Sequence, residues 1–209
     1  MKEYWEGRYS KETKIWGDNP SLSAAMALER FNERKCRSLL VPGAGYGRNA
    51  VVFSGAGMDV TGVEISESAC ALARSFAPDV RMVHSSVTGF DPGPGLYDAI
   101  YSYSLLHLFL REDRCSIVSL WHKALKEGGC VFCTVFSELD PACGRGPEVE
   151  PGTFESKPGR PVHYFTGKDL AAHFSGFHVL ETGIVEDSEN HGEEGPHVHV
   201  LRYIYALKK

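Results

Sequence analysis

Three glycines at alternate positions follow a short apolar segment near residue 40. Gly43, Gly45 and Gly47 lie in the stretch LLVPGAGYGRN, between a predicted strand over 38–41 and a predicted helix over 48–54. Glycine lets the chain turn tightly and lets a ligand lie directly against the main chain. The first N–H groups of the following helix can bind a ligand carboxylate or phosphate. This spacing predicts a loop that holds the charged part of a ligand.

An acidic residue ends the next apolar segment. Glu64 closes a predicted strand over 59–64 and follows Gly47 by the length of one helix plus one strand. A carboxylate at this place can accept hydrogen bonds from both hydroxyls of a ribose. The order strand, glycine loop, helix, strand and acid predicts a pocket for a nucleoside-containing cofactor. A nicotinamide-binding loop usually has the spacing GxGxxG, which this chain lacks. An NAD(P)-dependent oxidoreductase, which shares the glycine loop and the acid, is therefore kept only as the alternative.

The elements that position these residues alternate along the chain, which favours an α/β fold with a mainly parallel sheet. Two late strands joined by a polar loop predict a C-terminal antiparallel hairpin. The predicted strands cover 38–41, 59–64, 81–84, 97–101, 130–136, 177–186 and 198–206, and the predicted helices cover 21–34, 48–54, 67–76, 111–125 and 167–174. We therefore expect a Rossmann-like seven-stranded sheet with helices on both faces.

The chain of 209 residues predicts a single domain with four parts. Residues 1–34 form an aromatic arm and a helix that act as a lid, and residues 38–136 form the cofactor-binding core. Residues 137–176 form a variable, substrate-side region, in which the Gly- and Pro-rich stretch 141–161 is interpreted as a flexible loop. Residues 177–207 form the hairpin.

Composition narrows the class of protein. The net charge of −5 argues against nucleic-acid binding driven by bulk charge. No apolar run is long enough to span a membrane, and MKEYWEGRYS lacks the apolar segment of a secretory signal. The six cysteines do not have the spacing of a disulfide scaffold, and Cys130 and Cys133 lie in an apolar run typical of a buried strand. We expect a cytoplasmic protein with structural thiols.

Four stretches of the sequence resemble the class I S-adenosylmethionine-dependent methyltransferases, and the resemblance covers nearly the whole chain. They are YWEGRYSKETKIWGDNPS, LLVPGAGYGRN, VTGVEIS and YDAIYSYSLLHLF. Within that family, the chain is most similar to the small-molecule enzymes of the thiopurine, thiol/halide and tellurite-resistance types. It departs from the family at Val41 and at Ser85-Ser86, where many members carry an acid. Other groups must then bind the cofactor's ammonium group and adenine.

The resemblance implies S-adenosyl-L-methionine as the cofactor and assigns roles to residues. The three glycines line the methionine half, Glu64 holds the ribose, Ile65 lies beside the adenine, and Ser86 and Val87 approach its edge. Ser102 lies near the methionine or the acceptor, and Tyr9 and Trp16 close over the cofactor; packing of an N-terminal arm is the alternative for these two aromatic residues. On the acceptor side, the expected residues are Tyr103, His107 and Tyr164, with a core or helix-capping histidine as the alternative for His107.

The methyl group of a sulfonium is already activated, so alignment and exclusion of water supply most of the acceleration. We therefore expect no catalytic nucleophile, and a general base only if the acceptor arrives protonated. The predicted reaction is methyl transfer to a small-molecule acceptor by in-line displacement. A non-catalytic S-adenosylmethionine-binding protein is a second alternative. The sequence does not fix the oligomeric state.

The C-terminal hairpin carries a histidine- and acid-rich stretch, EDSENHGEEGPHVHV. His197 and His199 share one face of a strand, and with His191 and Glu193 or Glu194 they have the composition of a metal site. Methyl transfer to small acceptors needs no metal, and a solvated hairpin loop that enters an edge strand is the favoured interpretation of this stretch. We predict no metal, and a hairpin that borders the acceptor pocket together with His163 and Tyr164.

Overall fold

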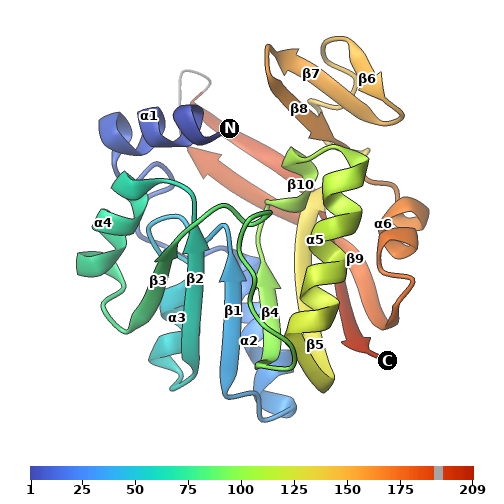
Figure 1. The fold of residues 1–209 in the computed structure, drawn as a ribbon. Coiled ribbons are helices and arrows are strands. Elements are labelled where there is room, and N and C mark those ends of the chain that lie inside the picture. The colour runs from blue at the N-terminus through green and yellow to red at the C-terminus, as the bar shows by residue number, and fades with distance from the viewer. Residues whose placement is uncertain (191–194) are drawn as a thin grey trace.

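The computed structural model describes residues 1–190 and 195–209. A seven-stranded sheet forms its centre, with the strand order β3-β2-β1-β4-β5-β10-β9 (Figure 1). The strands are β1 (Ser38–Pro42), β2 (Asp59–Glu64), β3 (Val80–His84), β4 (Tyr97–Ser102), β5 (Leu125–Phe136), β9 (Phe177–Asn190) and β10 (Pro196–Lys208). The first five pair in parallel, whereas β10 runs antiparallel to both β5 and β9. The predicted Rossmann-like sheet with a C-terminal antiparallel hairpin is confirmed.

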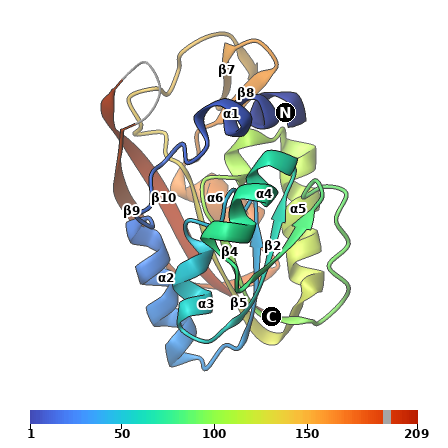
Figure 2. The same cartoon turned by 90° about the vertical axis from the view of Figure 1, so that its left-hand side faces the viewer.

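Helices cover both faces of this sheet (Figures 1 and 2). The helices are α1 (Lys2–Glu12), α2 (Leu22–Glu33), α3 (Ala50–Gly55), α4 (Glu67–Phe76), α5 (Arg111–Ala124) and α6 (Gly167–His173), with a 3-10 turn η1 (Leu106–Leu108). Phe31 of α2 and Phe53 of α3 pack into one core, and Trp121 of α5 and Leu170 of α6 pack into the other. Burial on both faces explains why β1 is an almost continuous apolar run.

The capping residues explain where two of the helices begin. The Ser66 hydroxyl accepts a hydrogen bond from the Ala69 N–H at 3.1 Å, and the Thr166 hydroxyl does the same for Asp169. A side-chain oxygen at this position satisfies a backbone donor that the helix itself leaves unpaired. The Ser66 cap fixes the start of α4 directly after Glu64, so it also fixes the entrance to the predicted ribose site.

The aromatic N-terminal arm contains a helix that was not predicted, α1 over Lys2–Glu12, with Trp5 and Tyr9 in ring contact one helical turn apart. One prediction for a segment was wrong. The stretch 141–161 is not a loop, because it contains β6 (Glu148–Glu150), β7 (Thr153–Lys157) and the start of β8 (Arg160–His163), which pair as a small antiparallel sheet. Pro158 and Gly159 form the two-residue turn between β7 and β8.

These two additions lie above the carboxyl ends of the parallel strands (Figures 1 and 2). The Arg160 guanidinium of β8 lies 3.7 Å from the centre of the Tyr4 ring of α1, so the two additions touch each other. A roof formed by α1 and the small sheet therefore covers the edge of the main sheet where a ligand of this fold binds.

The cysteines support the structural interpretation. All six are free thiols, and both Cys130 and Cys133 are fully buried in β5. The Cys130 sulfur lies 3.9 Å from that of Cys36, inside the core between the sheet and α2. Within the described part of the chain, no helix has the length and apolar character needed to cross a membrane.

Candidate active site

A cavity of about 880 Å³ lies between the roof and the carboxyl ends of β1, β2, β4 and β5. This volume suits a cofactor and a small second ligand together. The wall contains eleven of the residues that the sequence predicts for the site: Tyr9, Trp16, Gly43, Gly45, Glu64, Ile65, Ser86, Val87, Tyr103, His107 and Tyr164. One cavity therefore brings together the predicted cofactor and acceptor residues.

Two predicted residues lie elsewhere. Gly47 is outside the wall, and a side chain there would meet the Ala77 Cβ at 2.6 Å, so this glycine permits close packing of the loop against the end of α4. Ser102 is fully buried beneath the wall, because β4 continues through it. The helix start is also later than predicted: α3 begins at Ala50 and has six residues. The glycine loop itself, rather than this short helix, faces the cavity.

Glu64 is the acid of the cavity nearest to the glycine loop, and it is only 5% exposed. One carboxylate oxygen accepts the Gly45 N–H at 2.9 Å, and the other accepts the Ser66 N–H at 2.8 Å. Burial raises the pKa of Glu64, although these backbone hydrogen bonds oppose the shift. Each oxygen of a carboxylate has more than one lone pair, so both can also accept a ligand hydroxyl. This geometry fits a ribose diol.

The glycine loop is closed from above by an aromatic side chain. Gly45 has φ +56°, and a Cβ added there would lie 2.7 Å from the Tyr9 hydroxyl oxygen. Tyr9 is 4% exposed and makes ring contacts with Trp16 and Tyr46 at centroid distances of 6.1 and 6.2 Å. Burial, together with the Glu64 carboxylate, raises the pKa of Tyr9 well above its usual value. Tyr9 is therefore a neutral hydroxyl at the loop.

A carboxylate of the roof holds α1 in place. Glu6 accepts hydrogen bonds from the Ser66 hydroxyl at 2.7 Å, from the Ser68 hydroxyl and from the Ser68 N–H. The two serine hydroxyls lower the pKa of Glu6 to about 2. Glu6 thus joins the roof to the first turn of α4, directly beside the loop that follows Glu64.

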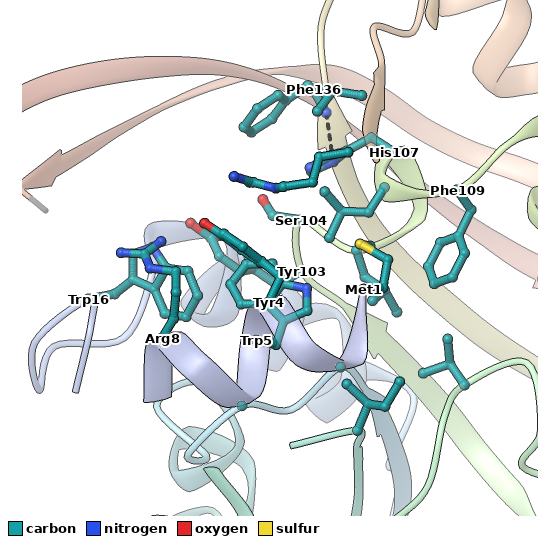
Figure 3. A pocket seen from close by; sticks show the side chains of 18 of the residues that line it. Met1, Tyr4, Trp5, Arg8, Trp16, Tyr103, Ser104, His107, Phe109 and Phe136 are labelled. Carbon is teal, nitrogen blue, oxygen red and sulfur yellow. Dashed lines mark hydrogen bonds between the residues drawn. The ribbon is translucent and has the colours of Figure 1, made fainter. Parts of the chain in front are cut away.

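The far side of the cavity, opposite α1, contains His107 and Phe136 (Figure 3). The Phe136 N–H donates to His107 Nδ1 at 3.3 Å, and the two rings stack at 4.1 Å. A neutral imidazole has one N–H, so the proton of His107 is on Nε2. His107 is buried and in the wall, and in this form it is a hydrogen-bond donor rather than a base.

Tyr103 also lines the cavity. Its hydroxyl donates to the Asp187 carboxylate of β9, and the Arg48 guanidinium lies 5.5 Å from the centre of its ring. Tyr164 directly follows β8 of the small sheet and makes a ring contact with Phe136 at a centroid distance of 5.9 Å. Burial raises the pKa of Tyr164 to about 12, so this tyrosine is neutral at physiological pH.

The sequence did not single out a second group of wall residues, of which some belong to the roof (Tyr4, Trp5, Arg8, Lys157 and Arg160) and some do not (Arg48, Phe136 and Arg145). His197 and His199 also line the wall, as expected of a hairpin that borders the acceptor pocket. The spacing of four between Tyr4 and Arg8 and between Trp5 and Tyr9 was a signal for a helix with one face over the cavity. The residues of the small sheet gave no such signal, because turn residues obscured its strands.

The metal hypothesis falls largely on residues that the structure does not describe. His191, Glu193 and Glu194 lie outside the described residues. Across residues 1–190 and 195–209, no group of three His, Cys, Asp or Glu side chains is placed to hold a metal ion. The absence of a metal site stays a prediction.

Comparisons with known proteins bear on this geometry. Residues 40–129 match the family model described as "Methyltransferase domain". This match, which covers less than half of the chain, and the fold both support the prediction of a class I S-adenosylmethionine-dependent methyltransferase. A comparison with curated protein sequences gives no match.

Solved methyltransferase structures share the fold. The 1,6-didemethyltoxoflavin-N1-methyltransferase of Burkholderia thailandensis, crystallised with 1,6-didemethyltoxoflavin and S-adenosylhomocysteine, is 20% identical with a TM-score of 0.72, over 100% of this chain and 87% of that chain. TehB of Haemophilus influenzae is 18% identical with a TM-score of 0.68, over 98% of this chain and 67% of that chain. Magnesium protoporphyrin IX methyltransferase of Synechocystis, with bound S-adenosylmethionine, is 13% identical with a TM-score of 0.67, over 100% and 97%.

Proposed function

We propose that this methyltransferase transfers the methyl group of S-adenosylmethionine to a small-molecule acceptor that shares the 880 Å³ cavity with the cofactor. The observation that carries the proposal is Glu64, a buried carboxylate in the cavity wall, one oxygen of which accepts the Gly45 N–H of the glycine loop while the other accepts the Ser66 N–H. In the proposed site, this carboxylate binds the ribose hydroxyls, and Gly43 and Gly45 let the methionine half lie against the main chain.

The other predicted residues complete the proposed cofactor site. Ile65, Ser86 and Val87 border the adenine, and Tyr9 and Trp16 cover the cofactor from α1. When bound, the cofactor supplies an electrophilic methyl group. The roof excludes water from it, and the far wall with Tyr103, His107 and Tyr164 orients the acceptor for in-line attack.

We also propose that the chain is one domain in which residues 1–34 form the lid, and that it acts in the cytoplasm without nucleic-acid partners. The free thiols of all six cysteines support a reducing compartment. The net charge of −5 supports an acceptor other than a nucleic acid.

Calorimetric titration with S-adenosylhomocysteine and, separately, with NAD tests the cofactor. Saturable binding of S-adenosylhomocysteine without NAD binding is expected, and the reverse result would identify the alternative oxidoreductase. A screen of phenols, thiols and heteroaromatic compounds that measures S-adenosylhomocysteine release then tests turnover. Binding without release from any acceptor would identify a non-catalytic binding protein.

A further inference from the structure

Cationic side chains outnumber carboxylates in the described part of the cavity wall, although the chain has a net charge of −5. Two of these cations have partners. Arg8 forms an ion pair with Glu12 at 2.7 Å, and the Arg48 guanidinium donates to the Asn19 carbonyl at 3.1 Å. Glu64, the other carboxylate of the described wall, accepts from the glycine loop. The remaining cations of the wall are Arg145, Lys157 and Arg160.

Two of the remaining cations stand side by side. Lys157 and Arg160 are directly opposite each other in the register of β7 and β8, and like charges at opposite positions of a strand pair are destabilising. Across residues 1–190 and 195–209, neither side chain forms an ion pair with a carboxylate. Glu155, two residues before Lys157, instead accepts the Gly159 N–H at 2.6 Å. An anionic ligand in the cavity would relieve this repulsion.

The guanidinium of Arg160 is held in place by an aromatic ring. It is half-buried and lies 3.7 Å from the centre of the Tyr4 ring, so its planar group stacks on that ring. Stacking leaves the N–H groups at the edge of the guanidinium, where two of them can bind a carboxylate or a phosphate through parallel hydrogen bonds. Within the described residues, no acceptor occupies this edge. Arg160 is therefore a preorganised anion-binding group in the cavity wall.

This group lies away from the proposed cofactor end of the cavity. The Tyr9 hydroxyl covers the glycine loop, where it would meet a Cβ added to Gly45 at 2.7 Å. Tyr4, on which Arg160 stacks, precedes Tyr9 by five residues of α1, which is about 7.5 Å along the helix axis. The anion that fits Arg160 is therefore on the acceptor rather than on the cofactor.

Arg145 lies beside the aromatic part of the wall. Burial raises the pKa of Tyr164, and the Arg145 charge is near enough to oppose that rise. The Tyr164 ring contacts the Phe136 ring at a centroid distance of 5.9 Å. Flat apolar surfaces beside cations suit an aromatic ring that carries an anionic group.

We infer that the methyl acceptor is an aromatic compound with a carboxylate or phosphate group, which Arg160 binds with Lys157 and Arg145 beside it; this rests on the proposed function. The anionic group is an anchor and is not itself methylated. Its two hydrogen bonds to the guanidinium fix the orientation of the ring, so that a separate nucleophilic atom of the acceptor faces the methyl group. The excess of positive charge also attracts such an acceptor into the cavity.

Probes of similar shape and different charge test the inference. Wild-type protein saturated with S-adenosylhomocysteine is titrated calorimetrically with 2-naphthoate, with 2-naphthyl phosphate and with the neutral 2-naphthamide. We expect at least one anion to bind about 10-fold or more tightly than the amide, the scale of one hydrogen bond to a charged group. The anion that binds more tightly distinguishes a carboxylate site from a phosphate site. The preference should shrink as the salt concentration rises.

Variants then assign the preference to residues. Arg160→Gln should remove most of it and leave the affinity for the amide within about threefold of wild type, whereas Arg160→Lys, which keeps the charge without the planar fork, should retain part of it. Arg145→Gln and Lys157→Gln should cause smaller losses, because both side chains are exposed. Arg81→Gln, at an exposed position of β3 outside the cavity wall, removes the same charge and is the matched control.

Several results would overturn the inference. One is wild-type protein, loaded with S-adenosylhomocysteine, that binds the amide as tightly as both anions or binds none of the probes. Another is an equal loss for amide and anions in Arg160→Gln, because Arg160 would then only support the roof. A larger loss for S-adenosylhomocysteine than for the anions in this variant would assign the guanidinium to the cofactor's own carboxylate. A wild-type protein that does not bind S-adenosylhomocysteine would instead contradict the proposed function.

Discussion

Replacing Glu64 by Gln isolates the contact on which the proposed cofactor site depends. Glutamine keeps the length of the side chain and one accepting oxygen, but it replaces the second oxygen by an amide donor. A hydrogen bond to a charged group contributes about 1.5–3 kcal/mol, so loss of one ribose contact should weaken S-adenosylhomocysteine binding by about 10- to 150-fold. Calorimetric titration measures this loss. Glu67→Gln, at an exposed position in the first turn of α4, is the control and should bind like the wild type.

The pH dependence of stability and of cofactor binding in the wild type provides a second test, because the direction of each change is predicted. The folded pKa of Glu64 is raised above its usual value of 4.5, so its protonation favours the folded state. This stabilising contribution is fully present below pH 4.5 and is lost as the pH rises through the folded pKa. Cofactor binding should change in the opposite direction, because only the carboxylate accepts from both hydroxyls. Binding that is within threefold of wild type in Glu64→Gln, and that does not weaken as the pH falls towards 4.5, would refute the assignment of Glu64 to the ribose.

Two further predictions concern the roof. Gly45→Ala should weaken S-adenosylhomocysteine binding and lower Tm, because the φ of Gly45 is +56° and the added methyl would lie 2.7 Å from the Tyr9 hydroxyl oxygen. Gly55→Ala is the control, because the space around Gly55 is open. Equal effects in both variants would contradict the prediction. Glu6→Gln should speed proteolysis of α1 at neutral pH, with Glu3→Gln unchanged. Since the folded pKa of Glu6 is lowered from 4.5 to about 2, its contribution to stability is present above pH 4.5 and is lost as the pH falls towards 2, so cleavage by pepsin at pH 2 should no longer distinguish Glu6→Gln from wild type.

Much of the sheet could be predicted from local sequence. The strand over 59–64 and the helix over 67–76 have the predicted bounds, because an apolar run and a capping serine are both local signals. The helix α1 was not predicted because its sequence is mostly polar and, among its residues, only Tyr9 is buried, so its aromatic spacing of four was the only signal. The small sheet was missed because Pro158 and Gly159, which make its turn, were interpreted as signs of a flexible loop.

The residues of the candidate site also differ in whether local sequence could predict them. Gly45 and Glu64 are adjacent parts of one strand–loop–helix–strand unit, so their proximity follows from the spacing. Asp140 and His199 are 59 residues apart and meet only because β10 pairs with β5 and carries His199 to the loop after that strand. Spacing alone could not reveal which nitrogen of His107 carries the proton, since that depends on a backbone N–H.

Some of the proposed site residues lie inside the matched methyltransferase domain and others lie outside it. The matched methyltransferase domain covers residues 40–129, which include the glycine loop, Glu64 and His107. Phe136, Asp140, Tyr164 and His199 all follow it in the chain, and the helix α1 precedes it. Of the proposed acceptor-side residues, Tyr103 and His107 therefore lie within the matched domain, whereas Tyr164 and the small sheet lie outside it. Exchanging the 137–165 segment, which carries Asp140 and the small sheet, should change which acceptors are methylated far more than it changes the affinity for S-adenosylhomocysteine, because the Glu64 contacts lie wholly within the matched residues.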